Sequence, residues 1–275
     1  MRIPLKPDKS QNRKLEKQQK KQLGLLSHLN RLKKYLKLTK SNKNILIVAF
    51  LFIVSLGIIF SLSLNGTPAV NTSSSPNISS TILAKTNDST VVKEGPYGNT
   101  SSNITVAYIV GVHPRESGAH QAMVESIREN DASLEKAYYL YIISAPEYQN
   151  NYPAERMNGQ ELANKYVVPD IINNHYQLAV DVHSSNGSYA VTRFVFVPTT
   201  ENKSLSIARE LANKIAWMNY YYPSDPSSTE YVTIPLIKAG IPSIVYETYK
   251  YDSNTTTRDH AKEFIKVIDT SQLWE

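Results

Sequence analysis

The second part of the chain alternates short apolar runs with segments of helical spacing. Five runs rich in Val, Ile and Tyr predict β-strands, and several have no polar face, which is typical of strands covered on both sides. These strands are expected at residues 104–112, 138–144, 178–183, 191–197 and 243–249. Helices are expected between them, at residues 117–130, 169–175, 204–218 and 258–268. The alternation predicts one three-layer α/β domain with a largely parallel mixed sheet over residues 104–275.

An earlier apolar run predicts a membrane anchor. Residues 45–64 contain no charge, and as a helix they would span about 30 Å, the thickness of the hydrocarbon core of a bilayer. A cleaved signal peptide is the competing interpretation. Its apolar region is usually shorter, however, and a small-residue cleavage site follows it, whereas no Ala-x-Ala follows Leu64. We therefore expect one transmembrane helix.

The charge of the chain changes sign at this helix. Residues 1–44 hold 14 Lys and Arg against 2 Asp and Glu, and the rest of the chain holds 16 against 22. An excess of Lys and Arg beside a helix predicts a cytoplasmic N-terminus, so we expect a single-pass protein of the cell membrane with an extracytoplasmic domain. The net charge of +6 thus describes the basic cytoplasmic arm, and nucleic-acid binding by the domain is not expected.

Acceptor motifs for N-glycosylation agree with this topology and predict a glycoprotein. All nine Asn-x-Ser/Thr motifs follow the predicted helix, at Asn65, Asn71, Asn77, Asn87, Asn99, Asn103, Asn186, Asn202 and Asn254. Six lie in the segment 65–103, where 20 of 39 residues are Ser, Thr or Asn and apolar periodicity is missing. This composition lacks the material for a core, so we expect a flexible tether with an end-to-end distance of roughly 35 Å.

Polar residues that follow the predicted strands indicate a metal site. The chain has no Cys, so its metal ligands must come from His, Asp and Glu. His113 follows the strand at 104–112, and Glu116 opens the next helix. Pro114 favours an extended His113, so both side chains can turn toward one point. Because function gathers at the carboxyl ends of parallel strands, this pair marks a candidate site.

A second strand end offers a similar group of residues. His183 ends the strand at 178–183, and Asp181, two residues earlier, points to the same face. Two imidazoles and one carboxylate leave a fourth zinc position for water, as in catalytic zinc sites, and Asp181 could accept an N–H from a ligand. His120 lies four residues after Glu116 on the same helix face and could replace Glu116 or His183 as a ligand, but we expect it to lie behind the ligands or in the core.

The third strand end carries Glu247, which is the only charged residue in the run 243–249. Such a carboxylate is either a general base that faces a metal or an ordinary acid that emerges into solvent. Tyr249 and Tyr251 follow it closely and could donate a proton or form part of a lid.

These residues together resemble the zinc carboxypeptidases and their relatives, succinylglutamate desuccinylase and aspartoacylase. The resemblance rests on His-x-x-Glu after a first strand, Asp-x-His-Ser after a middle strand, and a Gly-x-Pro strand that ends in Glu. It implies that His113, Glu116 and His183 hold zinc. It also implies that Glu247 is the general base that activates the zinc-bound water, and that Arg115, inside a His-x-Arg-Glu form similar to that of the carboxypeptidases, contacts substrate.

The chain departs from this family where substrate is bound. The Asn-Arg pair that grips a terminal carboxylate is not found, and the nearest candidates are Arg156 and Asn158 in AERMNGQ. Arg156 could clamp a carboxylate through two hydrogen bonds or polarise the scissile carbonyl. The Glu247 strand also lacks the Arg-Asp that usually follows it, which leaves the exopeptidase specificity open.

The leading interpretation is a membrane-anchored, extracytoplasmic, zinc-dependent hydrolase that resembles the carboxypeptidases and cleaves a peptide or amide bond. Its expected location suggests cell-envelope peptides as the substrate. A deacylase of N-acyl amino acids on the same scaffold is one alternative, which the resemblance to desuccinylase and aspartoacylase would allow. A surface binding or adhesion module without catalysis is another, although the intact His113, Glu116, His183 and Glu247 argue against it.

Overall fold

A computed structural model describes residues 78–148, 150–226 and 228–273 of the chain. The predicted cytoplasmic arm, the transmembrane helix at 45–64 and the first part of the tether lie outside these residues. Within the described part of the chain, no helix is long and apolar enough to cross a membrane.

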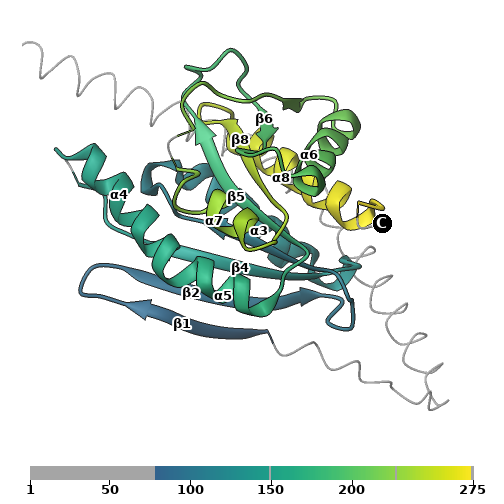
Figure 1. The fold of residues 1–275 in the computed structure, drawn as a ribbon, viewed down its shortest axis with the longest axis horizontal. Coiled ribbons are helices and arrows are strands. Elements are labelled where there is room, and N and C mark those ends of the chain that lie inside the picture. Colours follow the sequence, from purple (N-terminus) through teal and green to yellow (C-terminus); the bar gives the residue numbers. More distant parts are fainter. Residues whose placement is uncertain (1–77, 149, 227, 274–275) are drawn as a thin grey trace, which may run out of the picture. The chain divides into compact units, whose positions relative to one another are not determined.

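Eight strands form one mixed sheet (Figure 1). They are β1 (Ser79–Lys85), β2 (Thr90–Gly98), β3 (Thr105–Val110), β4 (Ala137–Ser144), β5 (Leu178–Ser185), β6 (Phe194–Phe196), β7 (Asn219–Tyr220) and β8 (Ser243–Tyr249), and their order is β1-β2-β4-β3-β5-β8-β6-β7. The four central strands β4, β3, β5 and β8 are parallel to one another. Antiparallel pairing occurs toward the edges, between β1 and β2, β2 and β4, and β6 and β8.

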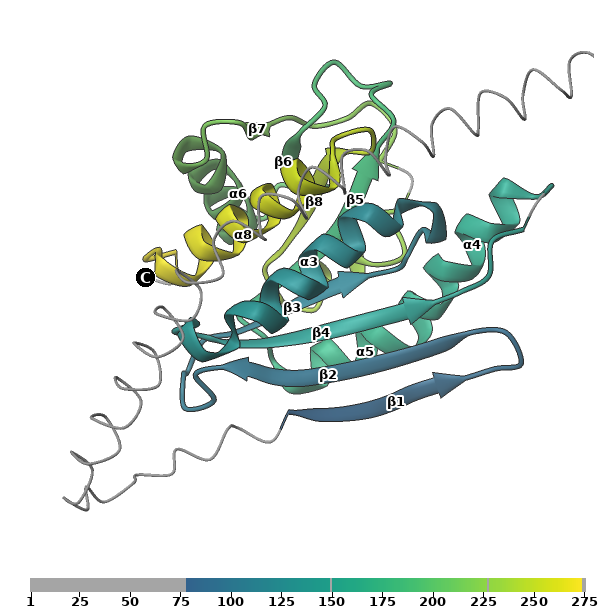
Figure 2. The same ribbon diagram turned by 180° about the vertical axis from the view of Figure 1, so that it is seen from behind.

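Helices cover both faces of this sheet (Figures 1 and 2). One face packs against α3 (Ser117–Asn130), α6 (Asn202–Lys214) and α8 (Asn254–Thr270), and the other against α4 (Tyr152–Leu162), α5 (Val168–Asn174) and α7 (Thr233–Lys238). Neighbouring residues of β3 show why the strands have no polar face: Tyr108 enters the first core, Ile109 enters the second, and both are fully buried. The prediction of a three-layer α/β domain is therefore confirmed.

Several predicted elements match closely. The helix at 117–130 and the strand at 243–249 have the expected bounds, and the weak helix predicted at 169–175 is α5. The strand predicted at 191–197 is shorter and comprises only β6. Helix α8 begins one turn before the predicted residue 258, because the Ser253 side chain accepts a hydrogen bond from the backbone N–H of Thr256 and caps a polar first turn.

The tether predicted at 65–103 is wrong for residues 79–98, which form β1 and β2. Strand β2 pairs with β4 along its length, and its Val91 and Tyr97 are buried. Strand β1 lies at the edge of the sheet with most of its side chains exposed, so it needs few apolar residues. Its Ser- and Thr-rich sequence therefore looked like a linker. The domain begins at least 25 residues before the predicted residue 104.

Helix α4 was not predicted, because its sequence contains Pro and Gly and follows a run of Asn. The Asn151 side chain accepts a hydrogen bond from the backbone N–H of Ala154, and Pro153 lies in the first turn, where it has no N–H to lose. Gly159 allows a close approach to the end of β3, since a Cβ atom there would lie 2.1 Å from the Val112 carbonyl oxygen. The helix continues through a π-helical segment, Ala163–Val167 (η3), into α5.

Candidate metal centre

The predicted residues meet where the strand order reverses. After β3 the chain goes to β4 on one side, and after β5 it goes to β6, β7 and β8, which lie on the other side. The carboxyl ends of β3 and β5 therefore form the switch point at which α/β sheets bind ligands. His113 follows β3, and His183 lies in β5 directly beside its register partner Glu247 in β8. Glu116 ends the 3-10 turn Pro114–Glu116 (η1) that leads into α3.

Glu116 bridges the two histidines. Its Oε1 lies 3.0 Å from Nδ1 of His113, and its Oε2 lies 2.9 Å from Nδ1 of His183. The backbone N–H of Ser184 donates to the same Oε2 at 3.0 Å. One ligand atom from each of the three residues lies within 4.8 Å of the others, and all three residues are buried. The structure thus brings together the three side chains that the sequence suggested.

A different group lies behind each imidazole. Nε2 of His183 lies 2.9 Å from Oδ1 of Asp181, close enough for an ion pair although the alignment is not that of a hydrogen bond. Thr233 donates to the other oxygen of Asp181 at 3.2 Å. Nε2 of His113 lies 3.0 Å from the amide nitrogen of Gln160. Both imidazoles therefore keep Nδ1 on the side of Glu116, and Asp181 lies where the sequence predicted it.

Electrostatics at this point favour a bound cation. Burial raises the pKa of Glu116, whereas the positive charges and hydrogen bonds of His183 and His113 lower it. The histidines prevail and hold this pKa well below its usual value. Burial lowers the pKa of His183, but Asp181 and Glu116 outweigh it and raise that pKa well above the usual value. The pKa of His113 is lowered, chiefly by burial. Buried carboxylates thus attract a positive charge, which a divalent ion held by two imidazoles and Glu116 would supply.

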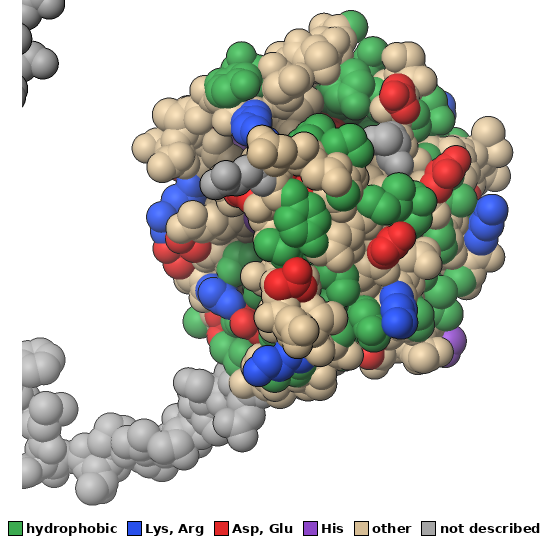
Figure 3. Space-filling view, turned by 90° about the vertical axis from the view of Figure 1, so that its left-hand side faces the viewer, with side chains coloured by type: hydrophobic (Ala, Val, Ile, Leu, Met, Phe, Trp, Pro, Cys, Tyr) green, Lys and Arg blue, Asp and Glu red, His purple; other side chains and the backbone are tan. Residues whose placement is uncertain are grey.

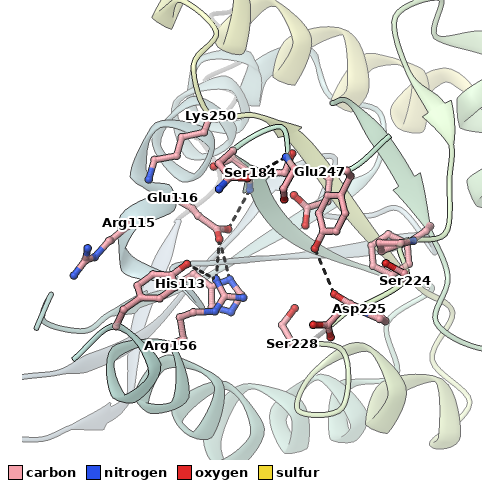
Figure 4. A pocket seen from close by; sticks show the side chains of 18 of the residues that line it. His113, Arg115, Glu116, Arg156, Ser184, Ser224, Asp225, Ser228, Glu247 and Lys250 are labelled. Atoms are coloured by element: carbon pink, nitrogen blue, oxygen red, sulfur yellow. Dashed lines mark hydrogen bonds and ion pairs between the residues drawn. The ribbon is translucent and has the colours of Figure 1, made fainter. Parts of the chain in front are cut away.

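Glu247 is a carboxyl group with an uncommitted oxygen. Burial raises its pKa to about 8, with Glu116 and Asp181 adding to the effect and His183 and Arg156 opposing it. Its Oε2 is buried and has no hydrogen-bond partner among the described residues. It lines the same pocket as His113 and Glu116, so it is an inward-facing acid rather than one that emerges into solvent (Figure 4).

The pocket in front of these residues has a volume of about 740 Å³. Arg115 and Lys250 lie on one side of His113, and Ser224, Asp225 and Ser228 lie on the other (Figure 4). Arg156 also lines the pocket. The side of the domain seen in Figure 3 carries charges of both signs scattered among hydrophobic side chains, without a broad basic surface.

Arg115 lines the pocket, but its guanidinium is already paired. Its Nε and Nη2 donate to Glu155 at 2.9 to 3.0 Å, and Nη2 also donates to the Tyr148 carbonyl at 3.0 Å. Glu155 is fully buried, so it depends on this arginine for its charge partner. Arg115 therefore forms part of the pocket wall, and its predicted contact with substrate stays a prediction.

Of the two candidates for a carboxylate clamp, only Arg156 reaches the site. Its Nη1 lies 3.4 Å from Oε1 of Glu116 and 3.1 Å from the hydroxyl of Tyr152. Asn158 is not among the residues that line the pocket. It lies two positions further along α4, which turns its side chain about 200° away from that of Arg156. Its proposed contact with substrate is therefore not supported.

His120 is a core residue and does not join the ligand group. It is buried, and its Nε2 donates to the carbonyl oxygen of Val182 at 3.1 Å. Burial lowers its pKa to about 4. Of the two tyrosines after Glu247, Tyr251 lines the pocket and is 67% exposed. Tyr249 packs near Arg193 and does not line it.

Two residues of this site were missed by sequence reasoning. Gln160 was missed because α4 was not predicted. Lys250 follows β8 directly, three residues after Glu247, and its position at a strand end was a signal that could have identified it. Its side chain makes no hydrogen bond or ion pair with the described residues, while its backbone N–H donates to Ser185 at 2.8 Å.

No protein-family model matches the chain, and no curated protein matches its sequence. Solved structures of similar fold include a putative carboxypeptidase A from Shewanella denitrificans OS-217, with 15% identity, a TM-score of 0.46 and coverage of 78% of this chain and 66% of that one. A metallo-carboxypeptidase from Burkholderia cenocepacia shows 12% identity, a TM-score of 0.48 and coverage of 70% and 64%. The cell shape determinant Csd4 from Helicobacter pylori, with product bound, shows 11% identity, a TM-score of 0.47 and coverage of 64% and 53%.

These structures belong to the metallo-carboxypeptidase group that the sequence motifs resemble. The chain spans between about half and two thirds of their length. Likenesses at these identities and TM-scores do not carry a reaction from one chain to another.

Proposed function

We propose that this chain is a zinc-dependent hydrolase of the carboxypeptidase-like kind that cleaves a peptide or amide bond. The observation that carries the proposal is the carboxylate of Glu116 between Nδ1 of His113 and Nδ1 of His183, with Glu247 in the adjacent strand. Two imidazoles and one carboxylate, all buried and with His113 and Glu116 lining the pocket, suit a catalytic zinc ion.

His113, Glu116 and His183 would hold the ion, which when bound supplies a Lewis acid for the scissile carbonyl and lowers the pKa of its water. Glu247 lies beside His183, lines the pocket and has a buried oxygen without a hydrogen-bond partner among the described residues. A divalent ion in the site would favour the carboxylate form of Glu247, and this carboxylate would accept the proton of the attacking water and return it to the leaving amine. Arg156, whose Nη1 lies 3.4 Å from Oε1 of Glu116, would stabilise the negative charge that develops on the carbonyl oxygen.

The cationic side of the pocket supports a substrate with a carboxylate near the scissile bond. Arg115 is committed to Glu155, whereas the Lys250 ammonium has no partner among the described residues. An ammonium at a pocket rim recognises carboxylate as a point charge. Lys250 thereby takes the place of the Asn-Arg pair that the sequence lacks.

The proposed location rests on residues 1–64, and it makes cell-envelope peptides the expected substrate class. Protease added to intact cells should remove the domain and spare the cytoplasmic arm. If the domain is protected in sealed cells and becomes sensitive only after lysis, the extracytoplasmic assignment is wrong, whatever the reaction proves to be.

Metal analysis together with a single conservative variant tests the reaction. The full-length chain should bind about one zinc ion, and zinc-loaded protein should hydrolyse members of a panel of short peptides with free carboxylates. Glu247→Gln should lower turnover by at least the roughly 10² to 10⁴ that a general base contributes, with zinc content and melting temperature little changed.

Other outcomes separate the alternatives. Lost zinc in Glu247→Gln would make Glu247 a ligand. Release of acyl groups from N-acyl amino acids, with no cleavage of peptides, would favour the deacylase. Full zinc occupancy without turnover on either panel, and no effect of Glu247→Gln on ligand binding, would favour a binding module.

A further inference from the structure

The two imidazoles of the centre have unlike groups behind them. The His183 ring faces a carboxylate, Asp181, whereas the His113 ring faces the neutral amide of Gln160 at 3.0 Å. Asp181, Gln160 and both rings are buried, so water does not take the place of either group. The difference is therefore built into the protein.

The backbone of α4 brings Gln160 close to the His113 ring. Gly159, the preceding residue of α4, lies so near the end of β3 that a Cβ atom would come within 2.1 Å of the Val112 carbonyl oxygen. Val112 is followed by His113. The close approach that only glycine permits thus brings the next side chain of α4 to Nε2 of His113.

The contact has consequences for the proton of His113. A neutral imidazole carries one proton, on either Nδ1 or Nε2. When the amide nitrogen of Gln160 donates to Nε2, the proton lies on Nδ1 and is donated to Oε1 of Glu116 at 3.0 Å. For Nδ1 to bind a metal ion, the proton must lie on Nε2, and Nε2–H then needs an acceptor. A half-turn of the Gln160 amide supplies its oxygen at the same position.

We propose that Gln160 is the positioning residue of His113: its amide donates to Nε2 in the metal-free centre and accepts from Nε2–H when Nδ1 is a ligand. A carboxylate in this place would serve only the second arrangement, and an apolar side chain would serve neither. His113 thus faces a partner that can either donate or accept, while the His183 ring faces the carboxyl group of Asp181. The inference rests on the proposed zinc site.

Zinc affinity of full-length chains, measured by competition with a chromophoric chelator, tests the proposal. Gln160→Leu should weaken zinc binding by about 10- to 100-fold, the usual cost of losing the partner of a ligand histidine. Gln160→Glu should bind zinc at least as tightly as the parent chain. Gln121→Leu is the matched control, since Gln121 is exposed on α3 and bonds only to Glu125 among the described residues, and its affinity should be unchanged.

Proton-detected nitrogen spectra of the histidines give a second readout that does not depend on activity. The parent chain should show His113 protonated at Nδ1 without zinc and at Nε2 with zinc, whereas Gln160→Glu should show the Nε2 form in both states.

Two results overturn the inference alone: a parent chain that binds zinc while Gln160→Leu retains its affinity, or a Gln160→Glu variant that loses as much affinity as Gln160→Leu. A parent chain that binds no zinc overturns the proposed function as well, so the two failures can be told apart.

Discussion

Glu116 and His183 are 67 positions apart in the sequence, and Oε2 of Glu116 lies 2.9 Å from Nδ1 of His183. The same oxygen accepts the backbone N–H of Ser184 at 3.0 Å. The carboxylate is thus fixed by β5 itself as well as by a ring carried on that strand. In this structure its orientation is therefore set by two groups of the same strand.

This arrangement predicts how zinc binding responds to loss of a ligand. His183→Ala and His113→Ala should each lose most of the bound zinc, because three protein ligands leave none to spare. Metal content after dialysis against a weak chelator measures it. His175→Asn is the control: His175 lies at the end of α5 with φ of 52°, a conformation that Asn tolerates, and its zinc content should stay at about one. Full occupancy in both alanine variants would disprove the ligand assignment.

Lys250→Met should weaken the binding of carboxylate-bearing substrates without changing the chemical step. Methionine keeps the length of the side chain but removes the charge, so KM should rise roughly 10-fold, in line with the loss of one charge-assisted contact, while kcat changes little. Substrates in which the carboxylate is amidated should show no difference between parent and variant. Lys266→Met, on the exposed face of α8, is the control. An equal rise in KM for free and amidated substrates would show that Lys250 does not recognise the substrate carboxylate.

Stability should fall in mild acid because of His120. Its folded pKa of about 4 lies below its unfolded value, so the unfolded chain binds more protons between about pH 6.5 and pH 4. Unfolding therefore becomes easier as the pH falls through this window, by roughly 2 kcal/mol between pH 7.5 and pH 5. His120→Gln can still donate to the Val182 carbonyl but does not titrate.

Urea unfolding of the metal-free chain at the two pH values measures this effect. The His120→Gln variant should show a smaller decrease in the free energy of unfolding than the parent chain. An equal decrease in both would assign the acid sensitivity to other groups.

The hairpin formed by β1 and β2 should contribute to the stability of the domain. Val91 is fully buried, so Val91→Ala should lower the free energy of unfolding by roughly 1–3 kcal/mol through lost contacts and a small cavity. Ile82→Ala in the paired strand β1 is the control, since Ile82 is 62% exposed and should contribute little. Thermal melts compare the two. Equal melting temperatures for Val91→Ala and the parent chain would mean that residues 79–98 do not stabilise the domain and behave as a tether.

The sequence predicts the central strands and the candidate ligands because both leave a local pattern in the chain. Strands buried on both faces are read as unbroken apolar runs, so β8 and the core of β3 were identified, together with the polar residues at their ends. The candidate ligands His113, Glu116 and His183 were found because each lies at or near such an end. Their convergence needed only the rule that parallel strands end at one edge.

What the sequence could not predict depends on tertiary contacts. Strand β1 is polar because it is an edge, and α4 contains a glycine because it packs closely on β3. Neither reason is visible in a local pattern. The pairing of Arg115 with Glu155 joins residues 40 positions apart through a helix that the pattern did not predict, so this ion pair could not be foreseen.

The position of β1 also has a mechanical consequence. The preceding chain enters the domain at Ser79, at the free edge of the sheet, and Ser79 pairs with Gly95 of β2. A pull on that chain is therefore borne first by the hydrogen bonds between β1 and β2. Strands β2 and β4 lie between β1 and β3, and His113 follows β3 in the chain. Force applied through the N-terminal segment would peel away the outermost strand before it could disturb the distances among His113, Glu116 and His183.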